Sequence, residues 1–367
     1  MEQWTEIRAA DFIEFNPRMS IKKGTIATKV AMDKLQPFTK KIPDSEKASF
    51  SGGSKFRNGD TIMARITPCL ENGKTAFVDI LGKDEVAFGS TEFIVMRARE
   101  GISDPQFIYY LATSPWFRNI AIKSMVGSSG RQRVQQSVLD DLVLNVPPLE
   151  EQKKISSFLC VLDLKIALNN EINDNLQQQA QAIYASMFVD NADPTWQQGH
   201  LSDLVTVRYG KDHKKLTDGI YPVYGSGGIM RHVERPLYDK ESVLIPRKGT
   251  LNNVMYVNQP FWSVDTMFYT EMRLPNVAKF VYHFVKAKDL ASMNAGSAVP
   301  SMTTDILNAM EVAIPPASVL EEFESLVAPM YRAMQENDAQ SNKLADLRDT
   351  LLPKLMSGEI DVSVIQL

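Results

Sequence analysis

The chain of 367 residues carries a formal charge of −4 and is 44% hydrophobic, which is ordinary for a soluble globular protein of two or three domains. It has no run of about eighteen apolar residues, and Met1–Ala10 lacks the apolar segment of a signal peptide, so we expect a cytoplasmic protein without a membrane span. Cys69 and Cys160 are too few for a disulfide scaffold and lack the spacing of zinc ligands.

The first globular region, residues 1–146, is predicted to mix short strands and helices. Its predicted strands are short apolar runs near glycine or proline clusters: Thr61–Ile66, Thr75–Ile80, Glu92–Met96 and Leu142–Val146. Its predicted helices are Pro105–Leu111 and Pro115–Ser124, each opening with proline, and the shorter Ser137–Asp141. The loop Gly127–Val134 between them carries two arginines.

A long helix is predicted next, over Leu149–Phe188. Apolar residues recur there at alternating steps of three and four, and neither glycine nor proline occurs between Pro148 and Pro194. This spacing is typical of an amphipathic helix with a coiled-coil seam. We assign residues 147–193 to this central spacer helix.

The second globular region, residues 194–314, follows the same plan as the first. The strand Ser242–Pro246 followed by Arg247 matches Thr61–Arg65, and Val264–Met272 matches Ser90–Met96. We align the glycine-rich stretch 221–228 with the first glycine cluster, Ser51–Ser54. The loop 294–301 takes the place of Gly127–Val134. The frame is kept while the loops differ, as expected for two recognition modules with different targets.

A second long helix, Val319–Met356, repeats the first. Sliding the sequence by 168 positions aligns Pro147-Pro148 with Pro315-Pro316 and holds the apolar register over the whole helix. The chain is therefore a duplicated unit of globular region plus helix. The residues predicted to pair the helices are Ile155, Leu162, Ile166, Asn169, Leu176, Ile183, Phe323, Met330, Asn337, Leu344 and Leu351.

Two expectations concern the geometry of these helices. A pseudo-twofold relation between the halves requires antiparallel helices, which places Asn169 opposite Asn337, where the two amides would fix the register. Two solvated asparagines are the alternative. Pro329 allows a kink or a late helix start. Residues 315–367 form the C-terminal helix and a strand-like tail, which we expect to return to the first globular region and bring the termini together.

Charge is unevenly distributed along the chain. Residues 1–145 carry 20 Lys and Arg against 17 Asp and Glu, and residues 194–313 carry 13 against 11. The acidic residues are concentrated in the helical segments. The globular regions are thus mildly basic although the whole chain is acidic, which is compatible with modules that present one basic face.

The repeat and several motifs resemble one family. The motifs are Val146-Pro147-Pro148-Leu149-Glu150-Glu151-Gln152, Leu351-Leu352-Pro353-Lys354-Leu355-Met356-Ser357-Gly358-Glu359, Gly59–Ile66 and Ser90–Arg97. Together they resemble the specificity (S) subunit of type I restriction–modification systems over essentially the whole chain. The resemblance implies an α/β (α+β) fold with two target-recognition domains separated by two antiparallel coiled-coil helices.

The resemblance also implies a function and partners. Each globular region would read one half of a bipartite asymmetric target on double-stranded DNA, and the helices would set the gap. Two adenine methyltransferase (modification) subunits would dock on the helices, and motor–nuclease (restriction) subunits would join them. S-adenosylmethionine is expected on the methyltransferase subunits, with no cofactor or metal on this chain. The bases read are not implied, because recognition loops vary most in the family.

The chain lacks the motifs of a self-sufficient methyltransferase. Asn16-Pro17-Arg18 has no second proline and no aromatic residue, and neither Pro-Pro pair follows Asn or Asp. Gly73-Lys74-Thr75 is interpreted as a turn, because Pro68 stands where a phosphate loop needs its first glycine. The four histidines show no metal spacing. We therefore expect a chain that is not catalytic by itself.

Candidate DNA contacts follow from side-chain chemistry. Arginine pairs bidentately with guanine and Gln or Asn with adenine, while Lys, Ser and loop N–H groups approach phosphates. The candidates in the first region are Arg131, Gln132, Arg133, Lys55, Arg57, Arg65 and Lys74. Those in the second are Tyr224, Ser226, Arg247, Lys248, Ser297 and Ser301. For each one, a solvent-facing loop residue is an equally good interpretation.

Another class of function fits part of the pattern. A coiled-coil scaffold with two protein-binding end domains would also show long helices and two globular regions. Basic loops favour DNA over this alternative, and salt-sensitive binding to duplex would separate the two.

Overall fold

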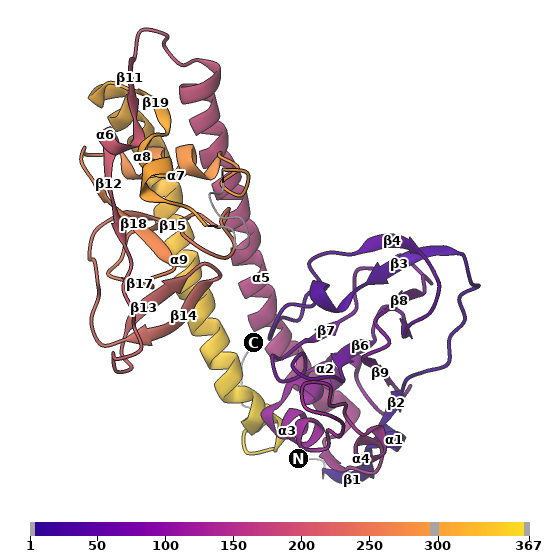
Figure 1. The fold of residues 1–367 in the computed structure, drawn as a ribbon. Helices are drawn as coiled ribbons and strands as arrows, with labels where there is room; N and C mark the ends of the chain where they lie inside the picture. Colours follow the sequence, from indigo (N-terminus) through magenta and orange to yellow (C-terminus); the bar gives the residue numbers. More distant parts are fainter. Residues whose placement is uncertain (1–3, 294–300, 363–367) are drawn as a thin grey trace. The chain divides into compact units, whose positions relative to one another are not determined.

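The computed structural model describes residues 4–293 and 301–362 and divides into two compact units (Figure 1). The first unit contains Met1–Glu171 and Asn337–Leu367, and the second contains Ile172–Glu336. Each unit therefore combines one globular region with about half of each long helix, instead of leaving the helices as a separate body.

The described residues of the first unit form three sheets. Its strands are β1 (Thr5–Arg8), β2 (Ile13–Phe15), β3 (Ile26–Val30), β4 (Glu46–Ser49), β5 (Lys55–Phe56), β6 (Thr61–Ala64), β7 (Thr75–Phe77), β8 (Ala87–Gly89), β9 (Phe93–Ala98) and β10 (Val143–Val146). They pair in the orders β2-β9-β6-β7, β4-β3-β8-β5 and β1-β10. The helices of the globular region are α1 (Ala9–Phe12), η1 (Met32–Lys34), α2 (Pro105–Thr113), α3 (Pro115–Lys123) and α4 (Gln136–Asp140).

Local sequence explains where α2 and α3 begin. The Asp104 carboxylate accepts the Phe107 N–H at 2.8 Å, and the Ser114 hydroxyl accepts the Phe117 N–H at 3.3 Å. Each of these caps is followed by proline, whose missing N–H costs nothing in the first turn. Both predicted helices are confirmed, with α2 running two residues further than expected.

The second unit repeats this arrangement. Its strands are β11 (Gln197–His200), β12 (Val205–Tyr209), β13 (Tyr221–Gly225), β14 (Gly228–Val233), β15 (Ser242–Pro246), β16 (Met255–Val257), β17 (Trp262–Ser263), β18 (Met267–Met272) and β19 (Glu311–Ile314). They pair in the orders β12-β18-β15-β16, β14-β13-β17 and β11-β19. Its globular helices are α6 (Leu201–Leu204), α7 (Ala278–Lys286) and α8 (Thr304–Asn308).

The strand pairings define which elements correspond. β13 pairs in parallel with β17 and antiparallel with β14, as β3 pairs in parallel with β8 and antiparallel with β4. The stretch that begins at Tyr221 thus corresponds to β3, and its alignment with Ser51–Ser54 was wrong. Glycine spacing misled the alignment because glycines mark turns in general, whereas the parallel partner identifies the strand.

The central strand of each unit is buried on both faces. In β6, Ile62 packs into one hydrophobic cluster and Met63 into another, and in β15 Leu244 and Ile245 divide in the same way. Two covered faces explain why both strands are continuous apolar runs without alternation. Burial of each such side chain contributes about 1.5–3 kcal/mol, so the ends of β6 and β15 are firmly placed.

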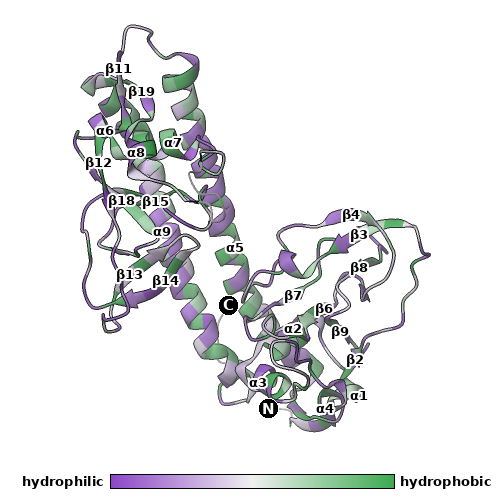
Figure 2. Ribbon diagram, in the orientation of Figure 1, coloured by the Kyte–Doolittle hydropathy of each residue, from purple (hydrophilic) through white to green (hydrophobic). Residues whose placement is uncertain are grey.

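The long helices are α5 (Leu149–Ala185), which continues into a π-helical turn at Ser186–Asp190, and α9 (Ala317–Met356). Within the first unit, Asp163 contacts Arg348 and Asn169 contacts Gln340; within the second, Asn173 contacts Met334. In the second unit the ring centres of Tyr184 on α5 and Phe323 on α9 also lie 6.2 Å apart. The partner number on α9 thus falls as the number on α5 rises in each unit, so the helices run antiparallel in both. Hydrophilic and hydrophobic residues alternate along each helix (Figure 2).

The predicted helix ends need small corrections. The α-helical part of α5 ends at Ala185, and the remaining residues to Asp190 form the wider π turn. Helix α9 already begins at Ala317 and continues through Pro329, so a late start at this proline was wrong. Pro329 is exposed, and its ring faces solvent.

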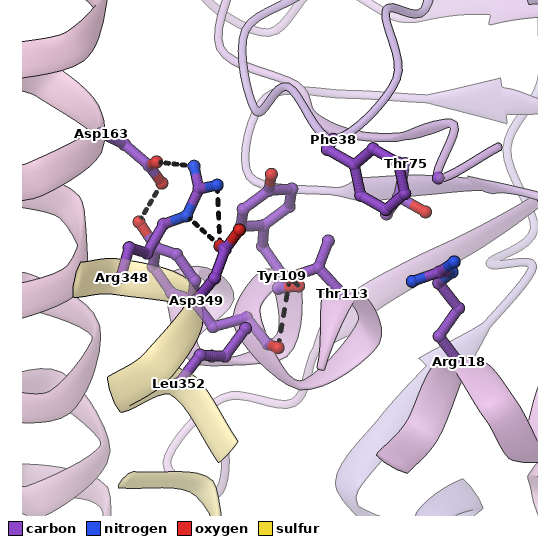
Figure 3. Close-up of a pocket in the computed structure, with 11 residues that line it drawn as sticks. Phe38, Thr75, Tyr109, Thr113, Arg118, Asp163, Arg348, Asp349 and Leu352 are labelled. Carbon is purple, nitrogen blue, oxygen red and sulfur yellow. Dashed lines mark hydrogen bonds and ion pairs between the residues drawn. The ribbon is translucent and has the colours of Figure 1, made fainter. Parts of the chain in front are cut away.

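Each globular region is fixed to the helix that follows it. Ile155 on α5 and Phe323 on α9, 168 positions apart, are fully buried in the main cores of their units. In the first unit the Tyr110 hydroxyl donates to Asp163 Oδ2 at 2.6 Å. Arg348 Nη1 donates to Asp163 Oδ1 at 2.6 Å (Figure 3). In the second unit His283 lies between Tyr331 Oη (2.9 Å) and Gln181 Oε1 (2.7 Å).

The tail returns to the first unit, as expected. Val362 is buried in the core of that unit, and Ile360 packs against it. Trp4 lies against Gly358, so the two ends of the described chain meet there. The described part of the tail forms no strand, and residues 363–367 lie outside the described residues. Across the described residues, no helix is long and apolar enough to cross a membrane.

Candidate nucleic-acid interface

An arginine follows the central strand at the same position in both units. The Arg65 N–H donates to Glu92 O at 2.9 Å, and its carbonyl accepts the Val134 N–H at 2.8 Å. The Arg247 N–H donates to Thr266 O at 2.9 Å, and its carbonyl accepts the Met302 N–H at 2.9 Å. The predicted match between Thr61–Arg65 and Ser242–Arg247 is therefore confirmed at the level of hydrogen bonds.

These arginines stand at one edge of each four-stranded sheet. β6 and β2 end at this edge, and β9, which pairs antiparallel with both, begins there. In the second unit β15 and β12 end at the corresponding edge, where β18 begins. We call this the candidate edge of each unit.

The first unit brings the loop 127–132 to its candidate edge. Val126 and Arg133 exchange backbone hydrogen bonds of 3.0 and 2.9 Å, which close the loop at its base. The Gln132 carbonyl accepts the Thr67 N–H at 3.0 Å, which joins the loop to the segment after β6. Arg131 is exposed and Gln132 is half-buried. Arg131 and Gln132, two of the predicted DNA contacts, therefore lie beside Arg65, although more than 60 residues separate them from it in sequence.

Arg133 is paired with a carboxylate. Its Nη2 lies 2.7 Å from Glu92 Oε1 and its Nε 2.9 Å from Glu92 Oε2. The hydrogen bonds from Arg133 hold the pKa of Glu92 below its ordinary value against the effect of burial, and the charge of Arg65 acts in the same direction. Two of the five N–H donors of the Arg133 guanidinium are thus committed to Glu92.

The other candidate DNA contacts of the first unit differ in position and in the groups they contact. Lys74 lies next to β7 at the candidate edge, but its amino group donates to Met32 O at 2.9 Å. The Lys55 amino group lies over the Phe50 ring, 5.3 Å from its centre. Arg57 is exposed before β6, at the end of that strand opposite to Arg65, so the structure does not bring these two arginines together.

The second unit gathers most of its candidates around Arg247. The Arg247 guanidinium lies over the Tyr209 ring at 5.3 Å, and Nη1 donates to Asp265 O at 3.2 Å. Lys248 forms a β-bridge with Ser301. Ser226 lies against Gly249, the residue after Lys248. A Cβ atom added to Gly249 would stand only 2.7 Å from the Ser226 hydroxyl oxygen.

Two predicted residues of the second unit stand apart. Tyr224 is only 9% exposed and packs in a hydrophobic cluster, with its ring centre 6.2 Å from that of Phe261. Burial removes most of its surface from any ligand. Ser297 lies outside the described residues.

Further exposed basic side chains follow the first strand of each four-stranded sheet and are not among the predicted DNA contacts. The segment after β2 exposes Arg18, Lys22 and Lys23, and the segment after β12 exposes Lys211, Lys214 and Lys215. In the sequence, these residues form a basic cluster after the first strand of each four-stranded sheet, and this cluster could have identified them. Net charge per region hides this signal, because acidic residues elsewhere in the region offset it.

The described residues contain no group of three or more His, Cys, Asp or Glu side chains that could hold a metal ion. A cavity of about 50 Å³ beside Asp163 and Arg348 is lined by Phe38, Thr75 and Tyr109 among others (Figure 3). Cofactor pockets usually have volumes of roughly 300–1,000 Å³, so this cavity is too small for one.

Comparisons with known proteins agree with this organisation. The family described as "Type I restriction modification DNA specificity domain" matches residues 1–178 and 194–322. The type I restriction enzyme HindI specificity subunit of Haemophilus influenzae is 22% identical, over 83% of this chain and 87% of that protein. The MjaIX specificity subunit of Methanocaldococcus jannaschii is 23% identical, over 70% of this chain and 69% of that protein.

A solved structure shows the same fold. The S subunit of a type I restriction–modification system from M. genitalium superposes with a TM-score of 0.59 at 17% identity, covering 96% of each chain. That similarity concerns the fold alone. The family match, by contrast, covers both globular regions, most of α5 and the first residues of α9, and this chain therefore belongs to the type I restriction–modification DNA specificity family.

Proposed function

We propose that this chain is the DNA sequence-specificity subunit of a type I restriction–modification complex. The observation that carries the proposal is the repeated candidate edge, with Arg65 and Arg247 in the same hydrogen-bonded position of two units. Arginine after a rigid strand suits bidentate contact with guanine or with phosphate. Family membership and the names of the curated relatives support the same function. Nothing comparable supports a protein-binding scaffold.

Each globular region would act as a target-recognition domain, residues 1–146 for one half-site and residues 194–314 for the other. The strand frames correspond, but the loops at the candidate edge differ chemically. At the equivalent β-bridge the first unit presents Ile66 and Arg133, where the second unit presents Lys248 and Ser301. Different side chains at equivalent positions read different bases, so the target is bipartite and asymmetric.

The helices would dock the partner subunits. In the first unit α5 exposes Val161, Leu164 and Leu168, with exposed fractions of 54%, 69% and 46%. Steps of three and four residues place them on one helix face, and an exposed apolar stripe marks a surface for another protein. We assign it to one of two adenine methyltransferase subunits, with motor–nuclease subunits completing the complex. S-adenosylmethionine would bind to the methyltransferase subunits, and this chain would contribute recognition without catalysis.

The test is to map methylated adenines in host DNA with and without this chain. A complex of the chain with its own methyltransferase subunits should methylate one motif made of two specific halves and a fixed gap. Methylation that persists after deletion of the chain, or a motif without two halves, would contradict the proposal. Binding of the complex to duplex should weaken steeply with salt, whereas a protein scaffold would show no such dependence on DNA.

A further inference from the structure

One ion pair anchors the loop 127–132 of the first unit to the candidate edge. Glu92 receives Arg133 on both carboxylate oxygens, at 2.7 and 2.9 Å, and such fork-shaped pairs fix orientation as well as distance. The side chain of Glu92 is 23% exposed and that of Arg133 47% exposed. The pair therefore lies at the surface, where a ligand can approach the loop it holds.

Glu92 is itself fixed by its main chain. Its N–H donates to the Ser90 hydroxyl at 3.1 Å, and its carbonyl accepts the Arg65 N–H at 2.9 Å. One residue thus joins the start of β9 to the main chain of Arg65 and to the side chain of Arg133. The loop then closes back on itself through the Val126–Arg133 bridge.

The second unit shows that the fold does not need this ion pair. Thr266 occupies the position of Glu92, because its carbonyl accepts the Arg247 N–H. Ser301 occupies the position of Arg133, because it bridges Lys248 as Arg133 bridges Ile66. Both charged members are replaced by small neutral residues while the backbone hydrogen bonds remain. The ion pair consequently belongs to the loop of the first unit rather than to the common fold.

We infer that Glu92 is a positioning residue for half-site recognition by the first unit. It holds Arg133 so that Arg131 and Gln132 face the DNA, and it withholds Arg133 from direct base contact. The inference rests on the proposed function and assigns a role to a residue that makes no contact with bases.

The test uses the chain assembled with its methyltransferase subunits and a duplex library in which both half-sites are randomised. Glu92→Gln keeps the size of the side chain and removes its charge. Discrimination at the half-site of the first unit should fall roughly tenfold, the effect of one misplaced base contact. Discrimination at the other half-site should stay unchanged, which also shows that the complex is assembled. Arg247→Ala identifies which half-site belongs to the second unit.

Arg133→Met and the double variant separate positioning from direct contact. If Arg133 acts only through Glu92, both single variants and the double variant lose the same discrimination. A much larger loss in Arg133→Met than in Glu92→Gln would show that Arg133 reads DNA itself and would overturn the inference. Full discrimination in Glu92→Gln would also overturn it. Asp141→Asn, which breaks the exposed Arg8–Asp141 pair of the same unit, is the matched control and should change nothing.

The two proposals fail in distinguishable ways. If the wild-type complex selects no bipartite motif from the library, the proposed function is wrong. If the wild-type complex selects one and Glu92→Gln selects it equally well, only the positioning role is wrong.

Discussion

The Asn169 side-chain amide donates to the main-chain carbonyl oxygen of Asn337 at 3.3 Å, and the two residues stand at equivalent positions in the repeat. The same amide reaches Gln340 Oε1 at 2.9 Å and Ser341 Oγ at 3.1 Å. Asn169 is fully buried, and within the described part of the chain its Oδ1 has no hydrogen-bond partner. A buried acceptor without a partner costs about 1–3 kcal/mol, and such a cost is tolerated where a polar group selects one helix register.

The first prediction concerns this register. Replacing both Asn169 and Asn337 with Leu should leave the chain folded but allow slipped pairing of α5 and α9, because apolar side chains pack equally well one heptad away. Disulfide crosslinking should then succeed both for Ile166→Cys with Leu344→Cys and for the shifted pair Ile166→Cys with Leu351→Cys. A single register in the double variant, with an unchanged gap in the methylated motif, would argue against the role of the asparagines.

The second prediction concerns Arg131. If its guanidinium reads a base, Arg131→Ala should cost about 1–3 kcal/mol in binding and alter the preference in one half-site only. Selection from a randomised duplex library measures both effects. Equal loss on every sequence would mark a phosphate contact instead. Arg8→Ala, which removes an exposed arginine of the same unit that is paired with Asp141, serves as control.

The third prediction concerns stability of the first unit. Asp60 is 1% exposed and accepts two hydrogen bonds of 2.7 Å from Arg97 and one of 2.8 Å from the Arg57 N–H. Asp60→Ala removes the partner of the Arg97 guanidinium, whose side chain is only 13% exposed, so it should destabilise the unit by about 3–5 kcal/mol. Denaturant unfolding measures this cost. Asp141→Ala, which breaks an exposed pair, should cost less than about 1 kcal/mol; a similar cost for both would refute the argument from burial.

The fourth prediction concerns pH. Burial, together with a smaller effect of the charge of Lys286, lowers the pKa of His283 from 6.5 to about 4. The neutral ring donates through Nδ1 to Gln181 and accepts at Nε2 from Tyr331. Below pH 6.5 the unfolded chain binds a proton that the folded chain refuses, so stability falls as pH drops from 6.5 towards 4.

The size of this effect is about 3 kcal/mol, taken from the difference between the two pKa values. Denaturant midpoints between pH 7 and pH 4 measure it. His283→Gln retains hydrogen-bonding groups but does not titrate, so its stability should depend less on pH over this range. His232→Gln, a change at an exposed histidine, is the control and should keep the wild-type slope.

Much of the fold follows from the sequence because its signals are local or repeated. The slide by 168 positions predicts both the antiparallel helices and the meeting of Asn169 with Asn337. The capping residues Asp104 and Ser114, each followed by proline, place the starts of α2 and α3. The match of Arg65 with Arg247 rests on the buried strand before each arginine, whose apolar run is visible without coordinates.

Other features depend on contacts that sequence patterns do not encode. The parallel partner of β13 lies about 40 residues further along the chain, so glycine spacing could not identify that strand. Arg131 and Arg133 look equivalent in sequence, yet only Arg133 faces a carboxylate, which comes from the start of β9. Tyr224 looks like a loop aromatic, but its burial depends on Phe261 and its cluster.

The division into compact units has a consequence for how such genes can change. The second unit is one uninterrupted insertion, Ile172–Glu336, between two stretches that together build the first. Exchanging that single stretch between related genes would replace a whole module together with its own half of each helix, and the new junctions would fall near Asn169 and Asn337. One recombination event would thereby change the DNA preference at one half-site, while the residues that build the first unit stay the same.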